Sequence, residues 1–160
     1  MKKLRVYLDT SVINFLFVTD APDFRSITLD FFEEFSDEYE LFVSDVVLLE
    51  IEKDSSLEHK NLLLDALRRY NVALLPDDHT DEIITLATQY IEEGAIPRRK
   101  EEDAQHVAYA TLFEMDILLS WNFKHLANIN REQKIVLVNM KAGYHYPLRF
   151  LAPLELIYEQ

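Results

Sequence analysis

Four oxygen-bearing side chains occupy positions from which they could share one chemical site. Asp9 follows a short apolar segment, and Glu50 lies inside the apolar run Val46–Ile51, where an acid is expected to face a pocket. Asp103 opens a helix-forming segment, and Asn122 follows a strand-like one. Carboxylates that converge raise one another's pKa unless a cation offsets their charge. Hard divalent ions such as Mg²⁺ and Mn²⁺ take such oxygen ligands, activate water and offset the charge that develops on a phosphodiester.

The acids near the first two strands also have simpler structural explanations. Asp9 could cap the helix that follows it, and Thr10 or Ser11 could do the same. Glu50 could be a boundary residue that pairs with Lys53 one turn along the same helix. Taken singly, each of these explanations is at least as good as the chemical one.

The later residues have comparable explanations. Asp103 suits the first turn of a helix, where the positive end of the helix dipole favours an anion. Asn122 is an acceptable turn residue, and His106 is ordinarily a helical histidine whose hydrogen bonds are satisfied. The combination of acids at several strand ends is what favours a shared metal site.

Short apolar segments alternate with helix-forming ones along the whole chain, which predicts an α/β fold. When helices cover both faces of a parallel sheet, its strands are buried on both sides, so their sequences are continuous apolar runs. We therefore expect a single domain over residues 1–160, a three-layer α/β/α arrangement with a central parallel sheet of four to five strands. The expected strands are Leu4–Leu8, Glu40–Ser44, Val72–Leu75, Ile117–Ser120 and Ile135–Asn139. The expected helices are Ser11–Val18, Phe24–Phe35, Val46–Lys53, Leu57–Tyr70, Thr80–Glu93 (ended by Gly94) and Glu101–Met115.

Composition excludes several classes of function. The 160 residues include no cysteine, which rules out disulfides and thiolate metal sites. Only two glycines occur, so the glycine-rich phosphate loops of P-loop and dinucleotide-binding enzymes are missing. Apolar runs are too short for a signal peptide or a membrane span, which favours the cytoplasm. The formal net charge of −13 is unusual for a nucleic-acid binder, and either covers a solvated face or is partly concentrated in a metal-binding cleft.

The order of four segments resembles the PIN-domain nucleases, most closely toxins of the VapC kind and their solitary relatives. The more specific parts are the Asp-x-x-His-x-Ala-x-Ala pattern of Asp103–Ala110 and the Ser-Trp-Asn-Phe-Lys-His stretch that begins at Ser120. The resemblance implies a PIN-like fold and a Mg²⁺- or Mn²⁺-dependent endoribonuclease, which could be the toxin of a toxin–antitoxin pair. The four segments are Tyr7–Asn14, Val43–Lys53, Glu102–Ala110 and Asp116–Leu126.

The resemblance assigns roles residue by residue. Asp9, Glu50 and Asp103 match the three acids that hold the metal and carry catalysis. The fourth catalytic position, often an aspartate in the family, holds Asn122, which leaves a neutral group there and leaves the binding of a second ion open. Asp116 is excluded because it stands at the opposite, amino end of its strand. The residues expected to support the acids are Thr10, Ser11, Asn14 and His106.

An RNA substrate requires local cations that offset the net negative charge. Arg98, Arg99 and Lys100 directly precede Asp103, and Lys124 follows the fourth position, so these basic residues are expected to bind substrate. A solvated loop is the equally weighted alternative. The resemblance adds an antitoxin protein and a second copy of the chain as partners, the latter through a helix such as Ile27–Phe35, and no membrane.

Two other functions compete with the nuclease. A catalytically weak or inactive module of the same fold would use its acidic surface to bind a basic protein partner, or would bind RNA without cutting it. A phosphoryl-transfer enzyme with a nucleophilic Asp9 fits less well. A dehalogenase-type phosphatase requires a second acid two residues later, where the chain has Ser11.

Overall fold

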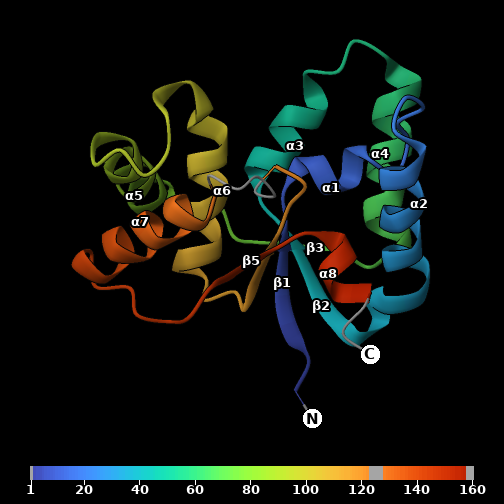
Figure 1. Cartoon of the computed structure of the whole chain (residues 1–160). Helices are drawn as coiled ribbons and strands as arrows, with labels where there is room; N and C mark the ends of the chain where they lie inside the picture. Colours follow the sequence, from blue (N-terminus) through green and yellow to red (C-terminus); the bar gives the residue numbers. More distant parts are fainter. Residues whose placement is uncertain (1, 123–127, 158–160) are drawn as a thin grey trace.

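The computed structural model describes residues 2–122 and 128–157, and its centre is a parallel β-sheet. Within this part of the chain the sheet has five strands in the order β3-β2-β1-β4-β5. The predicted three-layer α/β/α fold with a parallel sheet is confirmed (Figure 1). The strands are β1 (Leu4–Leu8), β2 (Tyr39–Val43), β3 (Ala73–Leu74), β4 (Ile117–Leu119) and β5 (Arg149–Leu151).

Side chains of the central strand β1 alternate between two hydrophobic clusters. Val6 and Leu8 are fully buried in the cluster on one face, and Tyr7 is fully buried in the cluster on the other. This alternation follows from the two-residue repeat of a strand. Because both faces of the sheet are covered, β1 consists almost entirely of large side chains without charge, and it was recognisable with its correct bounds.

Helices cover the two faces unequally (Figure 1). One face packs against α1 (Thr10–Asn14), α2 (Pro22–Asp30), α4 (Leu57–Arg69) and α8 (Pro153–Ile157), and the other against α5 (Thr80–Glu92), α6 (Glu101–Leu112) and α7 (Asn128–Lys141). The helix α3 (Asp45–Glu52) contributes Val47 and Ile51 to the first cluster and Val46 to the second. A π-helical turn, Phe31–Phe35, extends α2 within the single helix predicted there.

Local signals in the sequence account for several helix ends. The Ser44 hydroxyl accepts a hydrogen bond from Val46 N–H and caps α3, and Ser56 caps α4 in the same way through His59 N–H. Gly94 follows α5 with a φ of 75°, a left-handed conformation in which glycine is strongly favoured. The predicted C-terminal role of Gly94 is therefore confirmed.

The predicted strand Ile135–Asn139 is wrong, because these residues lie inside helix α7. Ile135 and Val138 are buried three residues apart, whereas Val136 and Leu137 between them are 42% and 58% exposed. A run of β-branched and apolar residues satisfies either period, and here the helical one is realised. The fifth strand is instead β5, Arg149–Leu151, whose three residues carry too short a pattern to be recognised.

The sheet register brings polar residues together at its carboxyl edge. Leu8 pairs with Leu119, so Asp9 and Ser120 follow on neighbouring strands, and Asp9 N–H donates to the Leu119 carbonyl at 3.2 Å. Ser44 follows β2 on the other side of β1. In Figure 1, β1 rises from the N-terminus to this edge, where α1, α3 and α6 begin. Among the helices of residues 2–122 and 128–157, none is long and apolar enough to cross a bilayer.

The helical assignment of residues 135–139 predicts unequal effects of two truncations. Ile135→Ala should lower the free energy of unfolding by about 2–5 kcal/mol, because it empties a fully buried position. Leu137→Ala should change it by no more than about 0.5 kcal/mol, because the side chain is exposed. Urea unfolding measures both. Equal losses would contradict the helix, since alternate residues of a strand share one face.

Candidate functional site

Asp9 is a buried carboxylate whose two oxygens are both held by hydroxyl groups. It is only 1% exposed. Ser11 Oγ donates to Asp9 Oδ1 at 2.5 Å, and Ser120 Oγ donates to Asp9 Oδ2. Although Asp9 stands at the N-cap position of α1, its side chain makes no capping hydrogen bond. The simple explanation of Asp9 as a helix cap is therefore excluded for its side chain.

Glu50 lies at the end of a hydrogen-bonded chain that begins at Ser44, directly after β2. Ser44 Oγ bonds Tyr7 OH at 2.7 Å, and Tyr7 OH bonds His106 Nδ1 at 2.6 Å. His106 Nε2 then donates to Glu50 Oε1 at 2.6 Å, and Thr10 Oγ1 donates to the same oxygen at 2.8 Å. Lys53 pairs with Glu102 at 2.9 Å rather than with Glu50. Glu50 is thus oriented by the core and not by a surface ion pair.

The charge balance of Glu50 and His106 depends on their contact. Burial by itself would raise the pKa of Glu50, but the hydrogen bond and charge of His106, together with Thr10, hold that pKa below its usual value. Burial by itself would lower the pKa of His106, but the hydrogen bond to Glu50 and the charges of Asp9, Glu50 and Asp103 raise it. This pair therefore favours a carboxylate facing an imidazolium.

The other two acids show the opposite tendency. Burial raises the pKa of Asp9, an effect that the charge of His106 and two hydroxyl bonds reduce and the charge of Asp103 increases. Burial also raises the pKa of Asp103; His106, Lys100 and Arg131 oppose the shift, and the Glu50 charge adds to it. Asp9 and Asp103 thus act on each other electrostatically. Both lie in an environment that favours a neighbouring cation.

The donor chemistry of these acids fits a hard divalent ion, because every polar atom offered is a carboxylate or hydroxyl oxygen. Asp9 and Glu50 each already accept two hydrogen bonds. A carboxylate has about four lone-pair positions, so each retains capacity for a cation. Within residues 2–122 and 128–157, however, no group of three or more histidines and acids is placed to hold a metal ion.

The remaining predicted residues differ in their closeness to the acids. Thr10 and Ser11 hold Glu50 and Asp9 directly, and His106 bonds Glu50. Asn122 N–H donates to Ser120 Oγ at 2.9 Å, one hydrogen bond away from Asp9. Asn14 lines a cavity that Glu50 also lines.

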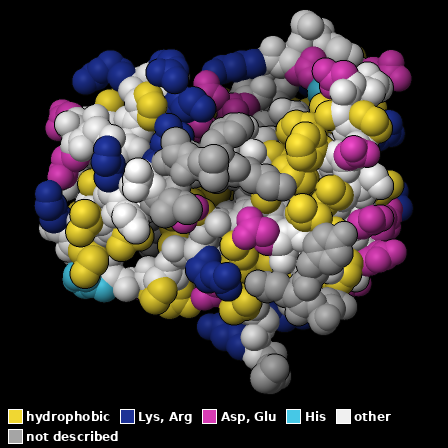
Figure 2. Space-filling model, viewed as in Figure 1, with side chains coloured by type: hydrophobic (Ala, Val, Ile, Leu, Met, Phe, Trp, Pro, Cys, Tyr) yellow, Lys and Arg dark blue, Asp and Glu magenta, His cyan; other side chains and the backbone are white. Residues whose placement is uncertain are grey.

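The predicted basic residues and Asp116 lie around this centre. Arg98–Lys100 forms a 3₁₀ turn directly before α6, and Figure 2 shows Lys and Arg side chains gathered over that end of the molecule. Lys124 lies outside the described residues. Asp116 bonds Arg5 N–H at 2.8 Å and Tyr146 OH at 2.6 Å at the amino edge of the sheet, opposite the edge where Asp9 lies.

Sequence reasoning missed four residues of this centre. Tyr7 was hidden because it reads as an ordinary apolar strand residue, although a hydroxyl inside a buried strand requires a partner. Ser120 follows β4, but that it lies beside Asp9 depends on the pairing of β4 with β1, which the sequence does not reveal. The charge of Arg131 acts on Asp103, and a side-chain hydrogen bond joins Glu102 to Glu50; no pattern along the chain signals these pairs.

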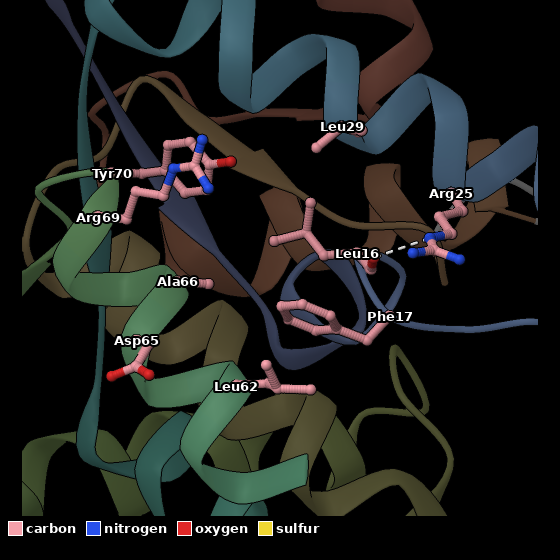
Figure 3. Close-up of a pocket in the computed structure, with 9 residues that line it drawn as sticks. All are labelled: Leu16, Phe17, Arg25, Leu29, Leu62, Asp65, Ala66, Arg69 and Tyr70. Carbon is pink, nitrogen blue, oxygen red and sulfur yellow. Dashed lines mark hydrogen bonds between the residues drawn. The ribbon is translucent and has the colours of Figure 1, made fainter. Parts of the chain in front are cut away.

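Cavities flank Glu50 on both sides of α3. One, of about 490 Å³, lies between α3 and the start of α6; the other, of about 390 Å³, is lined from α1, α3 and α4. A separate apolar cavity of about 310 Å³ contains none of the predicted site residues. In Figure 3 this cavity lies between three parts of the chain: the residues that follow α1, helix α2, and helix α4. Leu16, Phe17 and Leu62 lie around its centre.

The raised pKa of Asp9 predicts that its charge destabilises the fold. A group with a raised folded-state pKa contributes its full stability below the unfolded pKa and loses it as pH rises through the folded pKa. Asp9→Asn should therefore raise the free energy of unfolding at pH 7, and the gain should shrink on acidification towards about pH 4. Urea unfolding at both pH values measures it, in buffer without divalent ions.

Glu50→Gln is the matched comparison and should act in the opposite direction. A lowered folded-state pKa contributes stability above the unfolded pKa, which is lost as pH falls through the folded one. Removing this carboxylate also leaves buried His106 without its charged partner, so we expect a loss of about 1–3 kcal/mol at pH 7. Destabilisation by both substitutions would contradict the assignment for Asp9.

Comparison with known proteins adds one finding about the fold. No protein-family model matches the sequence, and no curated protein matches it. Among solved structures, the chain is similar to VapBC2 from Rickettsia felis bound to a DNA fragment from its promoter, with a TM-score of 0.55 and 17% sequence identity. The match covers 92% of this chain and 98% of that one. The chain therefore has the fold of the VapC-type PIN-domain proteins that its sequence resembles.

Proposed function

We propose that this protein is a divalent-metal-dependent endoribonuclease. The observation that carries the proposal is the buried Asp9 carboxylate, held by two hydroxyls beside Glu50 and Asp103 at the carboxyl edge of the sheet. Ligands of open parallel sheets gather at this edge. The shared fold with a VapBC2 complex supports the same class of function.

Asp9, Glu50 and Asp103 would hold Mg²⁺ or Mn²⁺. Such an ion, when bound, supplies a water of lowered pKa and offsets negative charge on a phosphodiester. The chain itself orients the acids. Ser11 and Ser120 fix both oxygens of Asp9, and the core fixes Glu50 through the residues that bond its Oε1. Asn122 contributes a neutral group where the family often has an acid.

Basic residues beside the acids would bind the phosphates of RNA. The charge of Lys100 acts on Asp103, and Arg98 and Arg99 are exposed in the same turn. Arg131 of α7 acts on Asp103 from another direction. Lys124 follows Asn122 closely in sequence and is proposed for the same role. Local cations of this kind make RNA binding compatible with a net charge of −13.

An antitoxin partner is part of the proposal. It is supported by the two-component nature of the VapBC2 complex from Rickettsia felis. The apolar cavity of Figure 3 is a suitable contact surface, because Leu29 and Leu62, which line it, are each 43% exposed. Light scattering on natively purified protein distinguishes one chain, a homodimer and a complex with a second protein; a bare single chain would argue against both partners.

The alternative function is a module of the same fold that binds RNA or a basic protein without cutting RNA. Two observations favour it: the neutral Asn122 in the fourth position, and the lack of a ready three-residue metal cluster in the described part of the chain. The cleavage experiment below decides between the alternative and the nuclease.

Asp9→Asn should abolish metal-dependent RNA cleavage. The substitution keeps the shape of the side chain and removes the charge that would bind the ion, so we expect a loss of at least about 100-fold in rate. Cleavage of a labelled oligoribonucleotide with Mn²⁺ or Mg²⁺ measures this loss. Asp81→Asn, an exposed acid in the first turn of α5, is the control and should keep full activity. Equal rates for wild type and Asp9→Asn would favour the non-catalytic module.

Replacing Arg98 and Arg99 together by alanine should weaken RNA binding. Loss of two phosphate contacts lowers the affinity for RNA. It also makes the plot of log affinity against log salt concentration less steep, by the contribution of about two contacts. Fluorescence anisotropy across several salt concentrations, in the Asp9→Asn background to prevent cleavage, measures both quantities. The exposed pair Arg68 and Arg69 of α4 provides the control. Unchanged affinity at low salt would remove the turn from the RNA-binding surface.

A further inference from the structure

The cavity between α1, α3 and α4 borders Glu50 but plays no part in holding the acids. Its volume is about 390 Å³, within the range of small-ligand sites. Glu50 and Lys53 line it, and they also line the cavity between α3 and α6. A strand of nucleic acid whose phosphate lies at Glu50 therefore has a cavity on either side for the next nucleotide.

The charges of the two cavities differ. Four glutamates line the cavity towards α6, with Lys53 as its only basic residue: Glu50, Glu52, Glu101 and Glu102. The cavity towards α1 and α4 has only two acids, Glu50 and Asp54, together with Lys53. A nucleotide carries at least one negative charge, so the cavity towards α1 and α4 repels it less than the cavity towards α6 does.

The cavity towards α1 and α4 also combines apolar and polar lining residues, as a nucleoside site does. Val18, Ile51 and Leu63 give it an apolar floor, and the last two are almost fully buried. Asn14 and His59 are polar groups of its lining. An apolar floor with a few placed polar groups is the usual construction of a small-molecule pocket, and it suits a base that stacks on one face and bonds along its edge.

His59 is held firmly by its surroundings. Its Nδ1 bonds Asp54 Oδ2, and Asp54 Oδ1 accepts from Ser56 N–H at 2.9 Å. The Phe17 ring meets the imidazole edge-on, at 6.3 Å between centroids. Within the described residues, no other hydrogen bond engages the Nε2 atom or the Asn14 amide. The imidazole is therefore oriented, and both groups are available to a ligand.

We propose that this cavity is a nucleoside subsite, which takes the base and ribose of the nucleotide next to the phosphate held at the acids. The inference rests on the proposed function and extends it, because His59 and Asn14 would then select the base beside the cut. An imidazole nitrogen donates or accepts according to its proton, and an amide does both, so the pair can read a base edge.

Mononucleotide binding tests the subsite without requiring cleavage. The probes are the 5′-monophosphates of adenosine, guanosine, cytidine and uridine, titrated into protein labelled with ¹⁵N-histidine in buffer without divalent ions. At least one probe should bind saturably and shift the His59 imidazole signals. His79 is the internal control. Like His59 it pairs with an acid, Glu82, and meets an aromatic ring, Phe113, edge-on, but it does not line this cavity.

Variants then locate the contact. His59→Ala and Asn14→Ala should each lower the affinity for the preferred nucleotide by about tenfold, which corresponds to the loss of one hydrogen bond of about 1.4 kcal/mol. His79→Ala should leave its affinity unchanged. Thermal unfolding confirms that each variant is folded, and Asn14→Ser provides a second, milder change at that position.

The outcomes separate this inference from the nuclease itself. Unmoved His59 signals with all four nucleotides, or full affinity in both alanine variants, would overturn the subsite, even in a protein that cuts RNA. Saturable shifts at His59 that both variants weaken would support it. The same shifts in a protein without cleavage activity would support nucleotide binding and overturn the proposed nuclease.

Discussion

The contact between His106 and Glu50 is the interaction on which the rest of this edge of the molecule depends. His106 comes from α6 and Glu50 from α3, so their 2.6 Å hydrogen bond joins a helix of one face to a helix that contributes to both hydrophobic clusters. Tyr7 ties the same imidazole to the central strand. His106 is 2% exposed, so leaving its imidazole without the Glu50 carboxylate costs about 1–3 kcal/mol. The spacing of the two helices and the orientation of Glu50 therefore have a common cause.

The same imidazole explains how acids gather in a protein that is already strongly acidic. Its charge opposes the rise in pKa of Asp9 and Asp103, and it contributes to the lowered pKa of Glu50. The protonated form of one buried imidazole thus favours the charged forms of three carboxylates. The balance is incomplete, since Asp9 and Asp103 keep raised pKa values. A net charge of −13 consequently says little about the local potential at this edge, where fixed cations and buried acids alternate.

The sequence predicted those parts of the fold that repeat within a short window. β1 has its predicted bounds because a buried strand between polar ends carries a strong signal, and Asp9 and Glu50 stood out as candidates because they end or interrupt apolar runs. Ile135–Asn139 was mistaken because an apolar run alone does not distinguish a strand from a helix, and β5 has only three residues. Ser120, which bonds Asp9 across 111 residues, depends on strand order, and no local pattern encodes that order.

The ends of β1 and β2 show what the chain gives up at Asp9. Both strands end in a polar residue that begins a helix, and at β2 that residue, Ser44, caps α3 with its side chain. At β1 the backbone carbonyl of Asp9 accepts from Val12 N–H at 3.3 Å, but its carboxylate turns to two hydroxyls and leaves the five-residue helix α1 without a side-chain cap. An aspartate is among the best caps, and a helix N-terminus favours its charge. The chain thus forgoes a local helix cap and holds this carboxylate with two hydroxyls instead, a conflict between local and global preference of the kind expected at functional sites.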